Sequence, residues 1–311
     1  TLRWMVLGLL IGIVVGALPG VGASLGMAIA LPLTLPLDGI NALIFLVGIY
    51  GGAMYGGSIS AILLNVPGTG GSAATTFDGY PMTRDGQAVT ALTIAATASA
   101  LGGSVSTLTL LALSPFLIEF VLAFQSPEYF VVAILGLAMI AIVAKSSIGK
   151  GLLSGAVGML IGTVGMAPTF PQERYTFGQL ALFDGINFIA ILIGLFAISE
   201  MIKLATEEGS IAKSKVNFAG SRSEGIRSVL RHPIKTIKSA WIGMAIGAIP
   251  GAGSSIANFI SYAEGMRSAD DPDTFGEGNS EGVIATEASN NGSIDGSLVP
   301  ALAFGIPGSG A

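Results

Sequence analysis

Gly12 to Ser24 reads GIVVGALPGVGAS, and 231 residues further along the chain Gly243 to Ser255 reads GMAIGAIPGAGSS. Seven positions are shared: Gly12/Gly243, Gly16/Gly247, Ala17/Ala248, Pro19/Pro250, Gly20/Gly251, Gly22/Gly253 and Ser24/Ser255. Proline removes a backbone donor and clashes with the preceding turn, while glycine permits backbone angles that are closed to other residues. An apolar helix is therefore expected to break at both stretches.

A second pair of similar stretches follows in the same order. Gly56 to Gly70 reads GGSISAILLNVPGTG, and 240 residues later Gly296 to Gly310 reads GSLVPALAFGIPGSG. Each half of the chain thus carries two PGxG breaks, which predicts an internal repeat. The offset is longer for the second pair because the second copy has a longer connection, which contains the acidic stretch Glu264 to Glu281. We expect this stretch to be a solvated loop and not a metal site.

The composition points to lipid as a solvent. The chain is 51% hydrophobic and 11% charged, with a mean hydropathy of +0.76, whereas soluble domains carry about 25% charged residues. Too few charges are present to cover a soluble protein of 311 residues. The sequence therefore predicts an all-α integral membrane protein, a multi-span helical bundle with two internal repeats related by inversion and with discontinuous helices broken at the PGxG motifs.

Several chemistries are excluded by residues that are missing. The chain has no cysteine and a single histidine, His232, so thiolate metal sites and a serine–histidine nucleophile are not visible. The stretch Pro67 to Thr76 resembles a phosphate loop, but no lysine follows its glycines. We predict that the protein is not an enzyme, needs no cofactor and binds no nucleic acid.

A spanning helix needs roughly 20 mostly apolar residues. The candidate runs are Leu2–Leu31, Ile40–Val66, Val89–Phe124, Tyr129–Ala144, Gly151–Met166, Ile186–Ile202, Ile237–Tyr262 and Val283–Ile306. The third run is too long for one span, and Gly102, Gly103 and Pro115 are possible breaks. Glycines at four-residue spacing predict close helix packing, at Gly8, Gly12, Gly16, Gly48, Gly52, Gly56, Gly158 and Gly162.

Charge predicts the topology and the organisation of the chain. Eight of the fourteen Lys and Arg lie between Lys203 and Lys238, which places this segment in the cytoplasm by the positive-inside rule. We divide the chain into a first transport repeat (1–125), intervening membrane helices (126–203), a cytoplasmic polar linker (204–236) and an incomplete second transport repeat (237–311).

The four breaks predict a binding site. Non-helical backbone at membrane depth is tolerated only where protein or a water-filled cavity covers it. Half-helix N-termini offer N–H groups to anions, and this favours an organic anion as substrate. The predicted substrate site consists of Pro19, Gly20, Gly22 and Ser24; Asn65, Pro67, Gly68, Thr69 and Gly70; Pro250, Gly251, Gly253, Ser254 and Ser255; and Pro307, Gly308 and Ser309. The alternative is that the breaks are kinks at the membrane surface.

Ionisable groups inside apolar segments are functional candidates. Glu287, Asn290, Asn291 and Asp295 immediately precede the fourth break, so we consider them candidates for coupling to Na⁺ or H⁺. The alternative is that EASNNGSID, at Glu287 to Asp295, is an interfacial loop.

Four long motifs resemble one transporter family. They are GALPGVGAS; YGGSISAILLNVPGTGGSAATTFDGYPM followed by RDGQA; GAIPGAGSSIANFISYAEG; and EASNNGSIDGSLVPALAFGIPGSG. These resemble the large membrane subunit of the tripartite tricarboxylate transporter family over nearly the whole chain.

The resemblance implies a multi-pass protein of the bacterial inner membrane. It implies uptake of di- and tricarboxylates such as citrate, driven by a sodium or proton gradient, together with a periplasmic solute-binding protein and a small four-helix membrane subunit. Members of the family are longer at the C-terminus, so we expect a chain that ends at Ala311 to be incomplete as a transporter. The rival interpretation is a membrane scaffold or enzyme that uses the loops for assembly only.

Overall fold

The computed structural model describes residues 1–19, 21–123, 147–167, 172–186, 218–249 and 253–306, together with isolated positions such as Ser309. The chain divides into two compact units, which are residues 1–123 with 205–311 and residues 124–204. The second unit contains α7 (Ile148–Gly162) and a hairpin of β1 (Gly165–Met166) and β2 (Glu173–Arg174). Most residues of the predicted spans Tyr129–Ala144 and Ile186–Ile202 lie outside the described residues.

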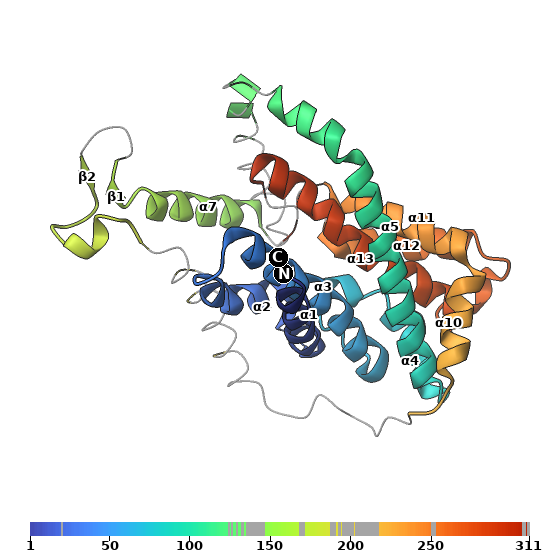
Figure 1. Ribbon diagram of the computed structural model, residues 1–311. Coiled ribbons are helices and arrows are strands. Elements are labelled where there is room, and N and C mark those ends of the chain that lie inside the picture. The colour runs from blue at the N-terminus through green and yellow to red at the C-terminus, as the bar shows by residue number, and fades with distance from the viewer. Residues whose placement is uncertain are drawn as a thin grey trace. The chain divides into compact units, whose positions relative to one another are not determined.

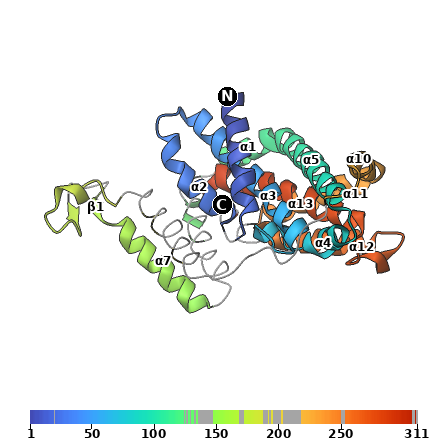
Figure 2. The same cartoon turned by 90° about the horizontal axis from the view of Figure 1, so that it is seen from below.

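The first half of the larger unit is helical. Its elements are α1 (Leu2–Ala17), α2 (Gly22–Ala30), η1 (Leu31–Thr34), α3 (Gly39–Leu64), η2 (Gly70–Ser72), α4 (Thr76–Arg84) and α5 (Ala88–Leu122). The predicted run Leu2–Leu31 is thus divided into α1 and α2, with Pro19 between them. Helix α1 lies along α3 in both views (Figure 1, Figure 2).

The second half of the larger unit is also helical. Its elements are α10 (Arg222–Arg231), α11 (Pro233–Gly247), α12 (Gly253–Arg267), η5 (Pro272–Thr274) and α13 (Ser280–Phe304). Helices α11 and α12 divide the run Ile237–Tyr262, as α1 and α2 divide the first run. Helix α10 falls within the segment that we assigned as a polar linker. It packs on α5 through Val229, which is fully buried.

Glycine contacts join α1 to α3 and α11 to α13. A Cβ on Gly12 would collide with the carbonyl oxygen of Ile49, and a Cβ on Gly243 would collide with that of Ser289. The same correspondence holds for three further pairs of contacts, which are Gly16–Ala53 and Gly247–Ser293, Gly52–Leu9 and Gly292–Ala240, and Gly56–Ile13 and Gly296–Met244. The close packing predicted from glycine spacing is confirmed in these helices. It is not seen at Gly158 and Gly162, where no described atom lies within 4 Å of an added Cβ.

Helix α5 is continuous, so the predicted breaks at Gly102, Gly103 and Pro115 are wrong. Pro115 cannot donate to the carbonyl of Leu111, but Ser114 Oγ donates to that oxygen at 2.8 Å and replaces the lost bond. Gly102 lies against the backbone of Ala288 in α13, where it permits close packing and does not break the helix.

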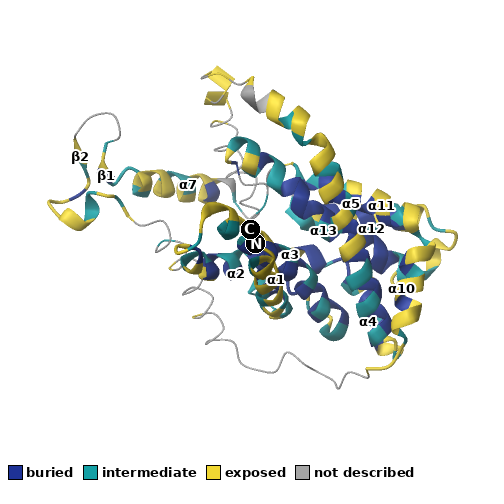
Figure 3. Ribbon diagram, in the orientation of Figure 1, coloured by how far each residue is buried: buried dark blue, intermediate teal, exposed yellow. Residues whose placement is uncertain are grey.

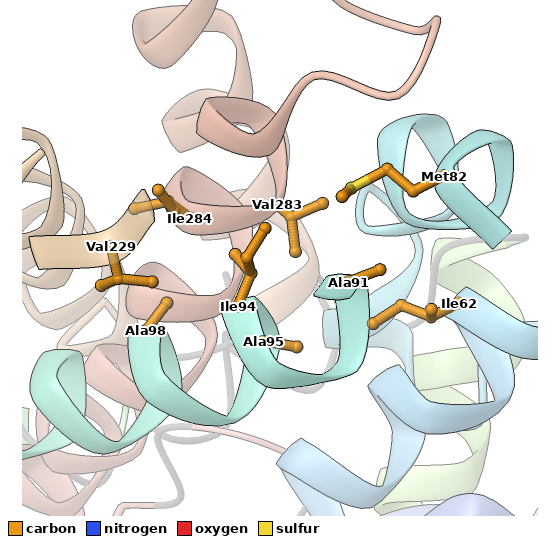
Figure 4. Packing of buried hydrophobic residues seen from close by; sticks show 9 residues of the cluster. All are labelled: Ile62, Met82, Ala91, Ile94, Ala95, Ala98, Val229, Val283 and Ile284. Atoms are coloured by element: carbon orange, nitrogen blue, oxygen red, sulfur yellow. The ribbon is translucent and has the colours of Figure 1, made fainter. Parts of the chain in front are cut away.

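The core of the larger unit lies where α3, α4, α5, α10 and α13 meet. Figure 4 shows its buried side chains, which are Ile62, Met82, Ala91, Ile94, Ala95, Ala98, Val229, Val283 and Ile284. In contrast, the C-terminal half of α5 exposes large apolar side chains (Figure 3), among them Leu108, Leu111 and Phe116. Such a surface would be costly in water, and it is typical of a helix that faces lipid or another subunit.

Two of the described helices are long and apolar enough to cross a membrane, Gly39–Leu64 and Ala88–Glu119. Helix α3 has 26 residues, which corresponds to about 39 Å at 1.5 Å per residue. This exceeds the roughly 30 Å of a bilayer core.

Candidate functional site

The first and third breaks have the same backbone conformation. Helix α2 begins at Gly22 with φ +68°, and α12 begins at Gly253 with φ +65°. No described atom lies within 4 Å of a Cβ added to either glycine. The N-terminal ends of both half-helices therefore lie next to open space. Gly20, Pro250 and Gly251 lie outside the described residues.

The second and fourth breaks also correspond. Helix α3 ends at Asn65 with φ 57°, and α13 ends at Gly305 with φ 67°, both in the left-handed region. In each, the following residue donates to the carbonyl six positions earlier, Val66 to Ser60 at 3.5 Å and Ile306 to Pro300 at 3.3 Å. Asn65 is an exposed cap of α3. Pro307 and Gly308 lie outside the described residues, and Pro67 is exposed beside buried Gly68.

The second and third breaks meet at η2. A Cβ on Gly70 would lie 2.5 Å from Ser255 Oγ, and a Cβ on Gly71 would lie 2.7 Å from Ser254 Oγ. Asn258, one turn into α12, donates its Nδ2 to the carbonyl oxygen of Gly71. Breaks from opposite halves of the sequence thus share one location.

Asn290 joins the same place from α13. Its Oδ1 lies against Gly71, and its Nδ2 donates to the carbonyl oxygen of Met54 at 3.1 Å. Thr69 is buried and caps η2. Its Oγ1 donates to Ser72 Oγ at 3.4 Å, and Ser72 Oγ donates to the Thr69 carbonyl oxygen at 2.9 Å. The Thr69 hydroxyl is therefore engaged in local structure.

Tyr50 of α3 lies near the first and fourth breaks. Its hydroxyl is 3.0 Å from Ser309 Oγ and 3.3 Å from Ser297 Oγ. Ala23, which follows the first break, packs in one cluster with Tyr50 and Met54. Ser24 is half-buried beside it. The breaks therefore gather in two groups, the second with the third and the first with the fourth.

Two carboxylates of α13 are buried without a cationic partner among the described residues. Glu287 is fully buried and accepts from Thr75 Oγ1 at 2.6 Å and from Ser99 Oγ at 3.0 Å. Asp295 accepts from Ser106 Oγ and, at 3.1 Å, from Thr107 Oγ1. Buried charges are usually paired, so carboxylates held by hydroxyls alone are functional candidates.

The interfacial-loop alternative for EASNNGSID is wrong, because the stretch lies inside α13 and is largely buried. Its Asn, Ser and Gly are poor helix formers, but α5 and α11 cover the helix and outweigh that preference. The four coupling candidates divide between two environments. Asn290 lies against Gly71, whereas Asn291 lies against Gly103 of α5. The carboxylates of Glu287 and Asp295 also point toward α5.

Asp78 of α4 holds the connection between α12 and α13. Its Oδ1 accepts backbone N–H groups from Gly276 at 2.8 Å, Gly278 at 3.0 Å and Asn279 at 2.8 Å. Burial raises the pKa of the Asp78 carboxyl above its usual 3.8, although these donors lower it. The stretch from Glu264 to Glu281, expected to be a solvated loop, is exposed at residues 270–273, whereas the backbone from Gly276 to Asn279 is fixed by this buried carboxylate.

The two acidic residues at the ends of the stretch from Glu264 to Glu281 form ion pairs. Glu264, at the end of α12, contacts Arg267 and Lys238, and these lower its pKa to about 2. Glu281 pairs with Lys235. Glu264 and Glu281 are therefore neutralised by neighbouring cations.

Sequence reasoning missed Tyr50, Thr75 and Ser99 as site residues. A signal was available for the hydroxyl of Ser99, because Ser99 and Ser106 are seven residues apart on α5 and their partners Glu287 and Asp295 are eight residues apart on α13. Tyr50 carried no such signal. Its role depends on which helices pack together.

Comparisons with known proteins identify the family. Residues 2–311 match the family described as the tripartite tricarboxylate transporter TctA family. Over 270 residues the chain is 40% identical to an uncharacterized 52.8 kDa protein of Agrobacterium vitis from the TAR-I ttuC′ 3′ region. That alignment covers 86% of this chain and 53% of the relative, so the chain spans about half the length of that protein.

A second Agrobacterium vitis protein, from the TAR-II ttuC′ 3′ region, is 38% identical over 65 residues. These are 21% of this chain and 27% of that protein. No solved structure matches the chain. The family match covers nearly every residue and agrees with the resemblance of the PGxG motifs. The chain belongs to the tripartite tricarboxylate transporter TctA family.

Proposed function

We propose that this chain is the permease subunit of a binding-protein-dependent secondary transporter that imports organic anions such as di- and tricarboxylates. The observation that carries the proposal is the meeting of the second and third breaks, where Gly70 and Gly71 lie against Ser254 and Ser255. Membership of the family supports transport as the activity. A carboxylate at this place would meet backbone N–H groups of α12 and small hydroxyls, with no Cβ on Gly253 to exclude it.

The two halves are proposed to be structural repeats related by inversion about an axis in the membrane plane. The matching glycine contacts of α1–α3 and α11–α13 support this, as do the matching φ angles at Gly22 and Gly253. Inverted repeats with broken helices at their interface are a common design of secondary transporters. Alternating access would result if the group formed by the second and third breaks and the group formed by the first and fourth breaks opened in turn to opposite sides of the membrane.

Transport is proposed to be driven by a sodium or proton gradient. Glu287 and Asp295 are suited to this because only hydroxyls of described residues hold them, so a cation or proton can neutralise each carboxylate. Both lie on α13, which also carries Asn290 at the meeting point of the breaks. A change in their charge would therefore act on the helix that lines the substrate site.

The proposed setting is the bacterial inner membrane, with several spans and with the basic segment Lys203 to Lys238 in the cytoplasm. A periplasmic solute-binding protein would deliver the anion, and a small four-helix membrane subunit would cover apolar surface. The exposed apolar half of α5 is a surface of the required kind.

The test is uptake by the full-length protein reconstituted with its two partners in proteoliposomes. Labelled di- and tricarboxylates should accumulate under an inward sodium or proton gradient, and only when the binding protein is present. Ser254→Ala should weaken apparent substrate binding by about 1–3 kcal/mol, or roughly fivefold to 150-fold in affinity, if its hydroxyl meets a charged oxygen. Ser104→Ala, on the exposed side of α5, is the matched control. Absence of uptake under every gradient would refute the function.

A further inference from the structure

Two buried side-chain amides converge on Gly71, and each has an oxygen without a donor. Asn258 is 1% exposed and Asn290 is 0% exposed. The Nδ2 of Asn258 donates to the Gly71 carbonyl, and the Nδ2 of Asn290 donates to the Met54 carbonyl at 3.1 Å. A carbonyl can only accept, so these bonds fix which end of each amide is nitrogen. Both Oδ1 atoms are therefore acceptors, and neither has a partner among the described residues.

Such atoms require an explanation, because buried acceptors in native proteins are almost always satisfied. Asn290 Oδ1 and Ser254 Oγ both lie at the face of Gly71 where a Cβ would stand, while Asn258 binds the carbonyl of the same residue. Three side chains with neutral oxygens, those of Asn258, Asn290 and Ser254, thus lie around one glycine, and a water or a cation could satisfy these oxygens.

We propose that a sodium ion binds between η2, α12 and α13, with Asn258 Oδ1, Asn290 Oδ1 and Ser254 Oγ among its ligands. This deepens the proposed function, since it names the coupling ion, but binding itself does not depend on transport. Amide and hydroxyl oxygens are hard ligands that suit Na⁺, and none of the three groups titrates, so a proton cannot take this place. Divalent cations favour carboxylate ligands, which the three lack.

Charge near the site is consistent with a cation. Glu287 lies one turn before Asn290 on α13, and it bonds to Thr75, which follows η2. No positively charged side chain forms an ion pair with Glu287 among the described residues, so a nearby Na⁺ would offset its charge. The N-terminal end of α12 at Gly253 would repel a cation but attract an anion. A substrate carboxylate there would place negative charge beside the sodium ion, so each ligand would favour binding of the other.

The experiment uses the purified full-length protein in detergent. Thermal unfolding and binding of ²²Na⁺ are measured in NaCl, KCl and choline chloride at equal ionic strength. We expect saturable stabilisation by Na⁺ that neither other cation gives. Asn258→Ala and Asn290→Ala should each weaken Na⁺ affinity at least tenfold. Ser261→Ala is the matched control, because this buried hydroxyl lies one turn after Asn258 on α12 and donates to the carbonyl oxygen of Ala285 at 2.8 Å.

Equal unfolding temperatures of the wild-type protein in the three salts, without saturable ²²Na⁺ binding, would overturn the site and leave water as the occupant. Unchanged Na⁺ affinity in Asn258→Ala and Asn290→Ala would also overturn it. Because the first comparison uses the wild-type protein, it decides the matter even if a variant fails to fold. Carboxylate uptake driven by a proton gradient without sodium would refute sodium as the coupling ion while leaving the proposed transporter function intact.

Discussion

Replacing Asp78 with alanine should separate α4 from the connection between α12 and α13. The carboxylate is 1% exposed and accepts three backbone N–H groups at 2.8 to 3.0 Å. Hydrogen bonds to charged groups contribute about 1.5–3 kcal/mol each, so three amount to roughly 4–9 kcal/mol before the cost of burying the charge. The raised pKa of Asp78 shows that this cost is substantial. We expect Asp78→Ala to lower the free energy of unfolding by about 3–5 kcal/mol.

Asp78→Asn is the matched control, because it keeps the volume and one acceptor oxygen for the three N–H groups. Its loss should be smaller, about 1–2 kcal/mol. The assay is thermal unfolding of the full-length protein in detergent, combined with hydrogen exchange at Gly276, Gly278 and Asn279. For a unit of this size the alanine variant should unfold on the order of 10 °C lower. Its three amides should also lose protection.

The pH dependence of the same pair tests the direction of the pKa shift. The folded-state pKa of Asp78 is raised above its ordinary 3.8, so protonation favours the folded state. Its contribution to stability is complete below pH 3.8 and is lost as the pH rises through the raised pKa. The free energy of unfolding of the wild-type protein should therefore rise relative to that of Asp78→Asn as the pH falls from 7 toward 4. Unchanged unfolding in Asp78→Ala, with the three amides still protected, would refute the reasoning.

Three further predictions concern packing, the site and topology. Gly12→Ala and Gly243→Ala should each lower the free energy of unfolding by about 1–3 kcal/mol through overpacking, because each new Cβ would meet a backbone carbonyl. Gly158→Ala is the control and should change the unfolding temperature little. Equal losses of stability in all three variants would contradict the contacts. Gly253→Val should reduce carboxylate uptake strongly while the protein still inserts into the membrane, because a β-branched residue is strained at φ +65°. Normal uptake by this variant would exclude the third break from the substrate site. Ser223→Cys, an exposed position on α10 of this cysteine-free chain, should react with impermeant thiol reagents only from the cytoplasmic side, so labelling in intact cells would overturn the topology.

Much of the local structure could be predicted from the sequence because it depends on local backbone chemistry. Proline and glycine at Pro19 and Gly22 divide the first apolar run into α1 and α2. Glycines at four-residue spacing predicted close helix packing, and the contacts of Gly12 and Gly243 confirm it. The same reasoning failed at Pro115, because a neighbouring hydroxyl, Ser114, replaced the missing bond to Leu111.

The sequence by itself determined the break between α1 and α2 and the faces that pack at Gly12 and Gly243, because proline, glycine and apolar surface act on their own segment. Only the tertiary structure decided which breaks meet. The bond from Asn258 to Gly71 joins residues 187 positions apart, and Glu287 reaches Ser99 across 188 positions. No local preference encodes such pairs, since they arise only when α5, α12 and α13 pack against the first half. Burial of EASNNGSID has the same origin, because the cost of desolvating its polar groups is offset by partners supplied from distant helices.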